Sequence, residues 1–212
     1  KNGKRYGKKM LEVSPDLVLC SSGPYPNKEW AEQSARQLME VAPMVSLHSY
    51  VAQPFFMEKE QYEEDYYECI DKVDTQCRKL VHQMREELGD DRLRISFDEW
   101  NVWYHSKPLD PLIQAAHCWE TAPPLLQDVY TFTDALMIGG MLITLLSHAD
   151  RIKIGCLAQL VNVIAPIMTA DNGPAWVQTI FYPFAHVSLF GRGTVLQTLV
   201  DSPRYDSKDF CD

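Results

Sequence analysis

The hydrophobic residues of this chain form short apolar runs that alternate with longer segments of mixed polarity. Four of the runs have the length and composition of buried strands, and they cover residues 16–22, 44–50, 92–100 and 151–162. The segments between them carry apolar residues at helical spacing and predict helices over 27–42, 61–88 and 131–150. This alternation predicts parallel strands joined by helical crossovers, and therefore an α/β fold.

Polar residues recur at the C-terminal end of every predicted strand. They are Ser21 and Ser22, His48 and Tyr50, Asp98 and Glu99, and Gln159 and Asn162. In a (β/α)8 TIM barrel the ends of all strands meet at one rim, where the active site forms. No G-x-G-x-x-G turn follows any run, which weakens the alternative of a doubly wound dinucleotide-binding sheet. The pattern therefore predicts an incomplete barrel, about half of one.

The segment after the third run is rich in proline. Pro108, Pro111, Pro123 and Pro124 fall within residues 106–124, which predicts an extended loop. Loops at this end of a barrel shape substrate pockets.

Composition narrows the range of partners. The formal net charge of −9 disfavours a nucleic-acid partner, because phosphate binding needs clustered Lys and Arg. The basic run at residues 1–9 is interpreted as a solvated helix end. The longest apolar run, residues 135–146, is shorter than the ~20 residues of a membrane span and predicts a buried helix. We therefore expect neither nucleic-acid nor membrane binding.

The six cysteines show no C-x-x-C spacing and no paired histidines, so we expect no zinc site and no disulfide framework. No metal or other cofactor is expected. No N-x-S/T sequon occurs, which fits a cytoplasmic protein. The first residue is Lys, and the last residues, RYDSKDFCD, predict no closing element, so we expect an internal segment of a longer chain.

The stretch SFDEWNVWY, residues 96–104, holds the main candidate for chemistry. Adjacent strand residues point to opposite faces, so only one of Asp98 and Glu99 is expected to face a pocket. A carboxylate beside Trp100, Trp103 and Tyr104 suits a sugar-cleaving enzyme, because aromatic faces hold the apolar side of a sugar ring. The structural alternative is a carboxylate that caps a loop or pairs with Arg94.

Other strand ends add groups that suit a polyol. His48 and Tyr50 are two residues apart and project to the same side of their strand. Gln159 and Asn162 carry amides that bind hydroxyl groups without bringing charge. The combination predicts a sugar-binding rim.

Four longer segments closely resemble the α-L-arabinofuranosidases of glycoside hydrolase family 51. They are VSLHSY, ISFDEWNVWYH, LAQLVNVIAPIMT and TIFYPFAHVSLFGRGTVL. Their order and spacing match the second half of that family's catalytic barrel. The resemblance implies that residues 1–195 form the C-terminal half of a TIM-barrel catalytic domain, covering about its last four β/α units. Residues 196–212 would begin the connection to a β-sandwich domain.

The resemblance also implies a role for each candidate residue. Glu99 matches the catalytic nucleophile. His48 and Tyr50 match residues that line the sugar pocket and orient the nucleophile. Gln159 matches a residue that hydrogen-bonds the arabinofuranose, and Trp103 matches an aromatic wall on the leaving-group side. Asp98 would then be a structural neighbour that faces away from the pocket.

The implied activity is that of a retaining, exo-acting enzyme without a metal, which releases L-arabinose from arabinan or arabinoxylan oligosaccharides. The family's general acid/base is a Glu that follows an Asn, and this sequence contains no Asn-Glu pair. We therefore expect the nucleophile half of a catalytic site. The alternatives are a catalytically inert segment or weak sugar-binding module, and a related retaining glycosidase such as a xylosidase.

Half a barrel would expose two strand edges and part of its apolar interior. Unpaired edges are templates for association with another chain. We therefore expect a homo-oligomer, in the simplest case a dimer formed through those edges.

Overall fold

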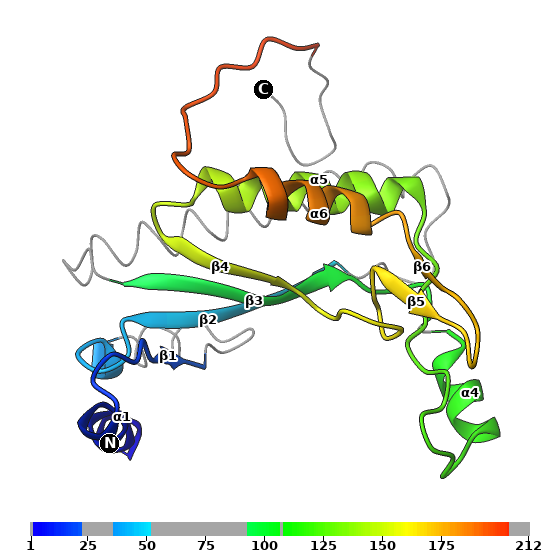
Figure 1. Cartoon of the computed structure of the whole chain (residues 1–212), viewed down its shortest axis with the longest axis horizontal. Coiled ribbons are helices and arrows are strands. Elements are labelled where there is room, and N and C mark those ends of the chain that lie inside the picture. Colours follow the sequence, from blue (N-terminus) through cyan, green and yellow to red (C-terminus); the bar gives the residue numbers. More distant parts are fainter. Residues whose placement is uncertain (1, 23–35, 52–92, 107, 204–212) are drawn as a thin grey trace. The chain divides into compact units, whose positions relative to one another are not determined.

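The computed structural model describes residues 2–22, 36–51, 93–106 and 108–203 (Figure 1). These residues divide into two compact units whose segments alternate along the chain. Unit 1 holds residues 2–22, 36–49, 93–100 and 148–156. Unit 2 holds residues 50–51, 101–106, 108–147 and 157–203.

Unit 1 is built on a sheet of four strands in the order β1–β2–β3–β4. The strands are β1 (Cys20–Ser21), β2 (Met44–Val51), β3 (Arg94–Val102) and β4 (Ile152–Leu157). β1 pairs with β2 in parallel, and the arrows of β2, β3 and β4 run in the same direction in Figure 1. The last residues of β2, β3 and β4 belong to unit 2. The parallel sheet confirms the predicted α/β class.

The observed strands match the apolar runs in the middle and depart from them at the ends. β2 and β3 lie within two residues of their predicted bounds. The first run pairs only at Cys20 and Ser21, and Asp16 lies in a turn. The fourth run stops being a strand at Leu157, although its apolar character continues. Gln159 and Asn162 therefore lie beyond β4, not at its end as predicted.

The basic N-terminal segment is helical, as predicted, and forms α1 (Asn2–Val13). Gly7 is buried, and a Cβ added there would lie 3.0 Å from Val41. This glycine lets α1 approach the residues that lead into β2. An ion pair between Lys4 and Glu40, 2.5 Å long, joins the same two segments. The basic run therefore packs against the residues that lead into β2, within unit 1.

Two helices pack against each other in unit 2. They are α5 (Phe132–Ser147), which the sequence predicted over 131–150, and α6 (Phe181–Phe190), and they lie side by side in Figure 1. Thr131 and Asp134 cap α5 reciprocally: the Asp134 carboxylate accepts from the Thr131 N–H at 2.6 Å, and the Thr131 hydroxyl oxygen accepts from the Asp134 N–H at 3.4 Å.

The proline-rich segment is not entirely a loop. Residues Asp110–Ala116 form the short helix α4, and Pro111 stands in its first turn. Proline is tolerated there because the first N–H groups of a helix have no intrahelical partner. The prediction of an extended loop over 106–124 is therefore wrong for these residues.

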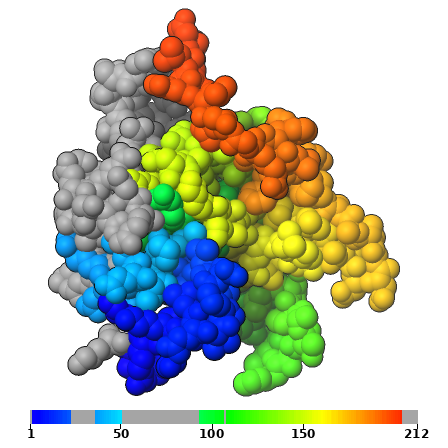
Figure 2. Space-filling view, turned by 60° about the vertical axis from the view of Figure 1, so that its left-hand side comes forward, coloured from blue at the N-terminus to red at the C-terminus, as the bar shows by residue number. Residues whose placement is uncertain are grey.

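Unit 2 also contains a hairpin that the apolar pattern did not predict. β5 (Ile167–Thr169) pairs antiparallel with β6 (Ala175–Val177), in the register Met168 to Trp176. β6 is exposed along its whole length, and Figure 2 shows this segment, in yellow, projecting at the surface.

Two predicted helices fall wholly or partly outside the described residues. Residues 61–88 lie outside them, and of residues 27–42 only 36–38 are seen to be helical. Within the described ranges, no helix combines the length and the apolar character that a bilayer crossing requires.

Candidate active site

Glu99 lies in the C-terminal half of β3, where Asp98 and Glu99 are half-buried between two buried stretches of the strand. Phe97 and Trp100 on either side are 3% and 0% exposed, whereas the side chain of Glu99 is 45% exposed. The carboxylate is thus presented to solvent from a rigid strand whose neighbours are in the core. This combination suits a group that must meet a substrate.

The imidazole of His48 on β2 lies between the two carboxylates of β3. Its Nδ1 is 3.5 Å from Oε2 of Glu99, and its Nε2 is 3.2 Å from Oδ1 of Asp98. Both contacts lie within unit 1. The predicted proximity of His48 and Glu99 is therefore present in the structure.

Strand alternation predicted that Asp98 would face away from the candidate residues. In the structure it lies among them. Its Oδ1 accepts from the Ser46 hydroxyl at 2.7 Å, and its Oδ2 accepts from the Ser96 hydroxyl at 2.8 Å. Alternation places Ser46 with His48, and Ser96 with Asp98, because each pair is two residues apart. Asp98 therefore contacts His48, and the expectation that it points away is corrected for this neighbour.

Cys20 on β1 lies near the same carboxylate. Burial raises the pKa of the Cys20 thiol, the charge of Asp98 raises it further, and a hydrogen bond with Ser96 opposes the shift. The thiol is consequently neutral near pH 7.

Tyr50 and Trp103 form an aromatic pair within unit 2. Their ring centroids are 5.5 Å apart with an interplanar angle of 69°, which is an edge-to-face arrangement. The sequence named both residues as sugar contacts, and the structure brings the two of them together.

Gln159 lies in a loop that a buried amide organises. The Asn101 side-chain nitrogen donates to the carbonyls of Ala158 and Ile164, both at 2.6 Å. The Gln159 N–H in turn donates to the Ile164 carbonyl at 3.3 Å, and its side chain is exposed. The buried Asn101 side chain therefore ties the loop together at Ala158 and Ile164, and Gln159 between them is exposed.

Two buried carboxylates fix the chain just after β3. Asp128, 1% exposed, accepts three backbone N–H groups, from Tyr104, His105 and Ser106, at 2.8 to 3.2 Å. Asp134, which is fully buried, lies 2.9 Å from Nε2 of His105 and accepts from the Tyr104 hydroxyl at 3.2 Å. These aspartates hold the segment that follows Trp103.

Tyr130 completes this buried network. Its hydroxyl donates to the Val102 carbonyl at 2.9 Å. Burial raises the pKa of Tyr130, and the nearby charges of Asp128 and Asp134 raise it further.

Sequence reasoning missed the serines and the buried aspartates. Ser46 and Ser96 stand two residues before His48 and Asp98, so the period of a strand could have indicated them. Asp128 and Asp134 follow no strand, and only the fold identifies their partners. Among the described residues, no cluster of three or more His, Cys, Asp or Glu side chains could hold a metal ion.

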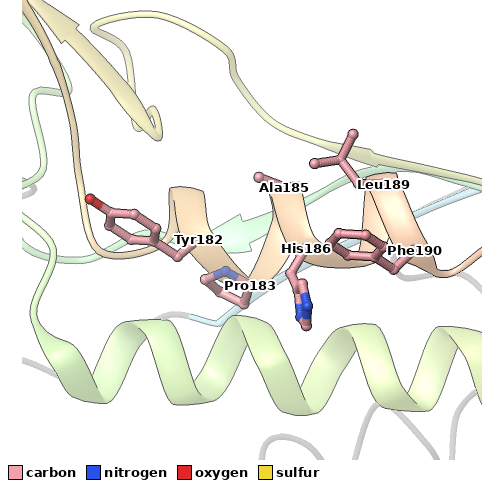
Figure 3. Close-up of a pocket in the computed structure, with 6 residues that line it drawn as sticks. All are labelled: Tyr182, Pro183, Ala185, His186, Leu189 and Phe190. Carbon is pink, nitrogen blue, oxygen red and sulfur yellow. The ribbon is translucent and has the colours of Figure 1, made fainter.

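An apolar groove lies on α6, away from these groups. It has a volume of about 450 Å³ and is lined by Tyr182, Pro183, Ala185, His186, Leu189 and Phe190 (Figure 3). The rings of His186 and Phe190 are 4.9 Å apart. The groove offers no carboxylate, so it does not replace Glu99 as the candidate centre.

A comparison with known families decides the affiliation of the chain. The family model described as "Alpha-L-arabinofuranosidase C-terminal domain" matches residues 98–212. The chain belongs to this family. The matched range begins beside Glu99 and continues through the predicted domain boundary after residue 195.

Curated relatives of this α-L-arabinofuranosidase domain family extend the similarity over the rest of the chain. An intracellular exo-α-(1→5)-L-arabinofuranosidase of Halalkalibacterium halodurans is 44% identical over 96% of this chain. One of Bacillus subtilis is 42% identical, also over 96%. Each match covers 41% of the relative, so the chain spans about two fifths of the length of these arabinofuranosidases.

Solved arabinofuranosidase structures agree with the fold. A family 51 α-L-arabinofuranosidase from Bifidobacterium longum aligns with a TM-score of 0.76 at 30% identity, over 98% of this chain and 44% of that one. The enzyme from Xanthomonas axonopodis aligns with a TM-score of 0.68 at 21% identity, over 86% of this chain and 37% of that one, which supports the fold alone.

Proposed function

We propose that this chain is the nucleophile half of a retaining, exo-acting α-L-arabinofuranosidase that releases L-arabinose from arabinan or arabinoxylan oligosaccharides. The observation that carries the proposal is the Glu99 carboxylate, 45% exposed on a largely buried strand, with His48 against it. The printed names of the relatives support the substrate class.

In the proposed organisation, residues 1–195 are the C-terminal half of a (β/α)8 catalytic barrel. Residues 196–212 begin the connection to a β-sandwich domain. The α/β sheet and the alignment with the Bifidobacterium longum structure support this assignment. We also propose a cytoplasmic location, which the word intracellular in the relatives' names supports.

Glu99 would attack the anomeric carbon of the arabinofuranose and displace the leaving oxygen, forming a covalent arabinosyl ester that water then hydrolyses. Tyr50, Trp103 and Gln159 would bind the sugar and its aglycone side. A retaining glycosidase needs a second carboxyl about 5 Å away to protonate the leaving group. Such general acid assistance is typically worth about 10²–10⁴ in rate, roughly 3 to 5 kcal/mol.

No Asn-Glu pair occurs in the sequence, so the acid/base residue is not assigned here. Glu120, in the proline-rich segment, forms a 2.7 Å ion pair with His117 at the surface and is not proposed as the acid. The combination of a proposed nucleophile with no assigned acid/base residue makes a sharp test possible. A substrate with a leaving group that needs no protonation should arabinosylate Glu99, and the ester should then hydrolyse slowly for want of a general base.

The test uses the 212-residue chain with 2,4-dinitrophenyl α-L-arabinofuranoside. We expect a burst of about one equivalent of dinitrophenolate and a protein mass increase of one arabinosyl residue, mapped to Glu99. Azide should restore turnover by attacking the ester and releasing arabinosyl azide. Glu99→Gln should slow the burst by at least about 10³-fold, whereas Glu120→Gln should not change it. An absent burst, or one that persists in Glu99→Gln, would exclude Glu99 as the nucleophile of this chain.

We further propose that the chain self-associates through its outer strands, β1 and β4, which lie at the two ends of the sheet order. β4 is exposed from Lys153 to Cys156. Light scattering over a range of concentrations should report a dimer, and a monomer at the highest concentration would contradict this proposal.

A further inference from the structure

Two side-chain oxygen atoms lie close to the Nε2 atom of His48. Ser46 Oγ lies 3.0 Å from it, and Oδ1 of Asp98 lies 3.2 Å from it. Ser46 has a single hydroxyl hydrogen, which it donates to Asp98 at 2.7 Å, because an ionised carboxylate only accepts. Both neighbours of Nε2 can therefore act as acceptors, which favours the tautomer that carries its hydrogen on Nε2.

The acceptors are themselves held in place. Ser96 donates to the second oxygen of Asp98 at 2.8 Å, so each carboxylate oxygen accepts one hydroxyl. The four side chains come from alternate positions of the neighbouring strands β2 and β3: Ser46 and His48 from one, Ser96 and Asp98 from the other. Side chains on paired strands are positioned more rigidly than side chains on loops.

We propose that Asp98, with Ser46, is the positioning residue of His48: it keeps the imidazole hydrogen on Nε2 and so determines what the ring presents to Glu99. The inference deepens the proposed function and rests on it for its catalytic meaning, since Glu99 is there the nucleophile.

The position of this hydrogen matters because Glu99 competes for it. Nδ1 of His48 lies 3.5 Å from Oε2 of Glu99, beyond ordinary hydrogen-bond distance. A hydrogen on Nδ1 would draw the two atoms together into a charge-assisted hydrogen bond. Asp98 opposes that change by holding the hydrogen at the other nitrogen. It therefore sets the distance between the imidazole and the attacking carboxylate.

The tautomer of His48 can be measured without any catalytic activity. Long-range ¹H–¹⁵N correlation spectra of the ¹⁵N-labelled 212-residue chain distinguish the two ring nitrogens, and His48→Gln assigns the signal by its loss. The spectra are recorded at the alkaline end of the histidine titration, where one ring hydrogen remains. We expect the Nε2–H form in the parent chain. In Asp98→Asn the tautomer ratio should shift at least about tenfold toward Nδ1–H.

Two serine variants form a matched pair. Ser46→Ala removes a group that contacts both Asp98 and His48, and should shift the ratio in the same direction by a smaller factor. Ser96→Ala removes a donor to Asp98 but leaves the carboxylate beside Nε2, and should keep the ratio within about twofold of the parent. The signal of His105, held by Asp134, reports whether each variant is folded.

The proposal is wrong if His48 keeps the Nε2–H form in folded Asp98→Asn and Ser46→Ala. The burst assay separates this result from a failure of the proposed function. A tautomer shift in a chain that is never arabinosylated would support the positioning role and reject the nucleophile. Arabinosylation of Glu99 with an unchanged tautomer would support the nucleophile and reject the positioning role.

Discussion

The two units contain the same pair of chemical groups, a histidine against a carboxylate, in two different environments. In unit 1, His48 contacts Asp98 and Glu99, whose side chains are 32% and 45% exposed. In unit 2, His105 contacts Asp134, which is completely buried. Contact with a histidine therefore does not by itself distinguish a candidate catalytic carboxylate from a structural one.

The difference lies in what else binds each carboxylate. Asp134 accepts backbone and side-chain donors of its own helix start, and Asp128 accepts three consecutive N–H groups. The two aspartates therefore satisfy the hydrogen-bond donors of residues 104–106 and of the start of α5. The Glu99 side chain, in contrast, is 45% exposed on β3. Burial and backbone saturation mark the structural role, and exposure beside a fixed imidazole marks the candidate chemistry.

The largest expected effect on stability tests this contrast directly. Asp134→Asn should lower the free energy of unfolding by about 2 to 3 kcal/mol, because it leaves buried donors facing an amide. Glu99→Gln should change it by less than about 0.5 kcal/mol, since the side chain is exposed. Urea denaturation of both variants measures the difference, with Asp201→Asn in the exposed C-terminal segment as a control. Equal losses for Asp134→Asn and Glu99→Gln would remove the distinction between the two clusters.

A second effect follows from the raised pKa of Tyr130. The unfolded chain releases this proton near pH 10, whereas the folded chain retains it at higher pH. The unfolded state then binds fewer protons, so stability falls as pH rises above about 10, by up to ~1.4 kcal/mol per pH unit. Tyr130→Phe should remove this part of the slope in alkaline denaturation curves. An unchanged slope would show that Tyr130 does not carry it.

The smallest expected effect concerns Cys20 in unit 1. Its pKa is raised by burial and by Asp98, so the thiolate is scarce at neutral pH. Asp98→Asn should lower the pKa of Cys20 and speed its alkylation at neutral pH by about two- to tenfold. Peptide mapping after iodoacetamide treatment measures this rate, with Cys118 as the internal reference. A slower reaction in the variant would contradict the assigned influence of Asp98.

The sequence predicted those parts of the fold whose apolar pattern is uniform. β2, β3 and α5 follow from clear runs, because each buries much of its apolar surface. The same reasoning extended the fourth strand too far, since apolar residues such as Leu160 and Val161 continue after the chain leaves the sheet at Leu157. It assigned no element to α6, whose residues FYPFAHVSLF lack a polar face of helical period.

The sequence named the principal candidate residues of the site but not the groups that support them. Glu99, His48, Tyr50, Trp103 and Gln159 were named from strand ends and family resemblance. The hydroxyls of Ser46 and Ser96 were not, because a serine inside a strand is equally consistent with simple packing. Their role depends on which strands are neighbours, and that is a property of the sheet order.

Asn101 has a consequence for the chemical ageing of the protein. Its amide uses both hydrogens on the Ala158 and Ile164 carbonyls, and its oxygen accepts the Val102 N–H at 2.8 Å. Deamidation would replace two donors with a carboxylate facing two carbonyl oxygens, in a side chain with no solvent exposure. The loop that carries Gln159 would lose its support. Spontaneous hydrolysis of one amide is therefore a route by which this chain would lose local order without any cut in its backbone.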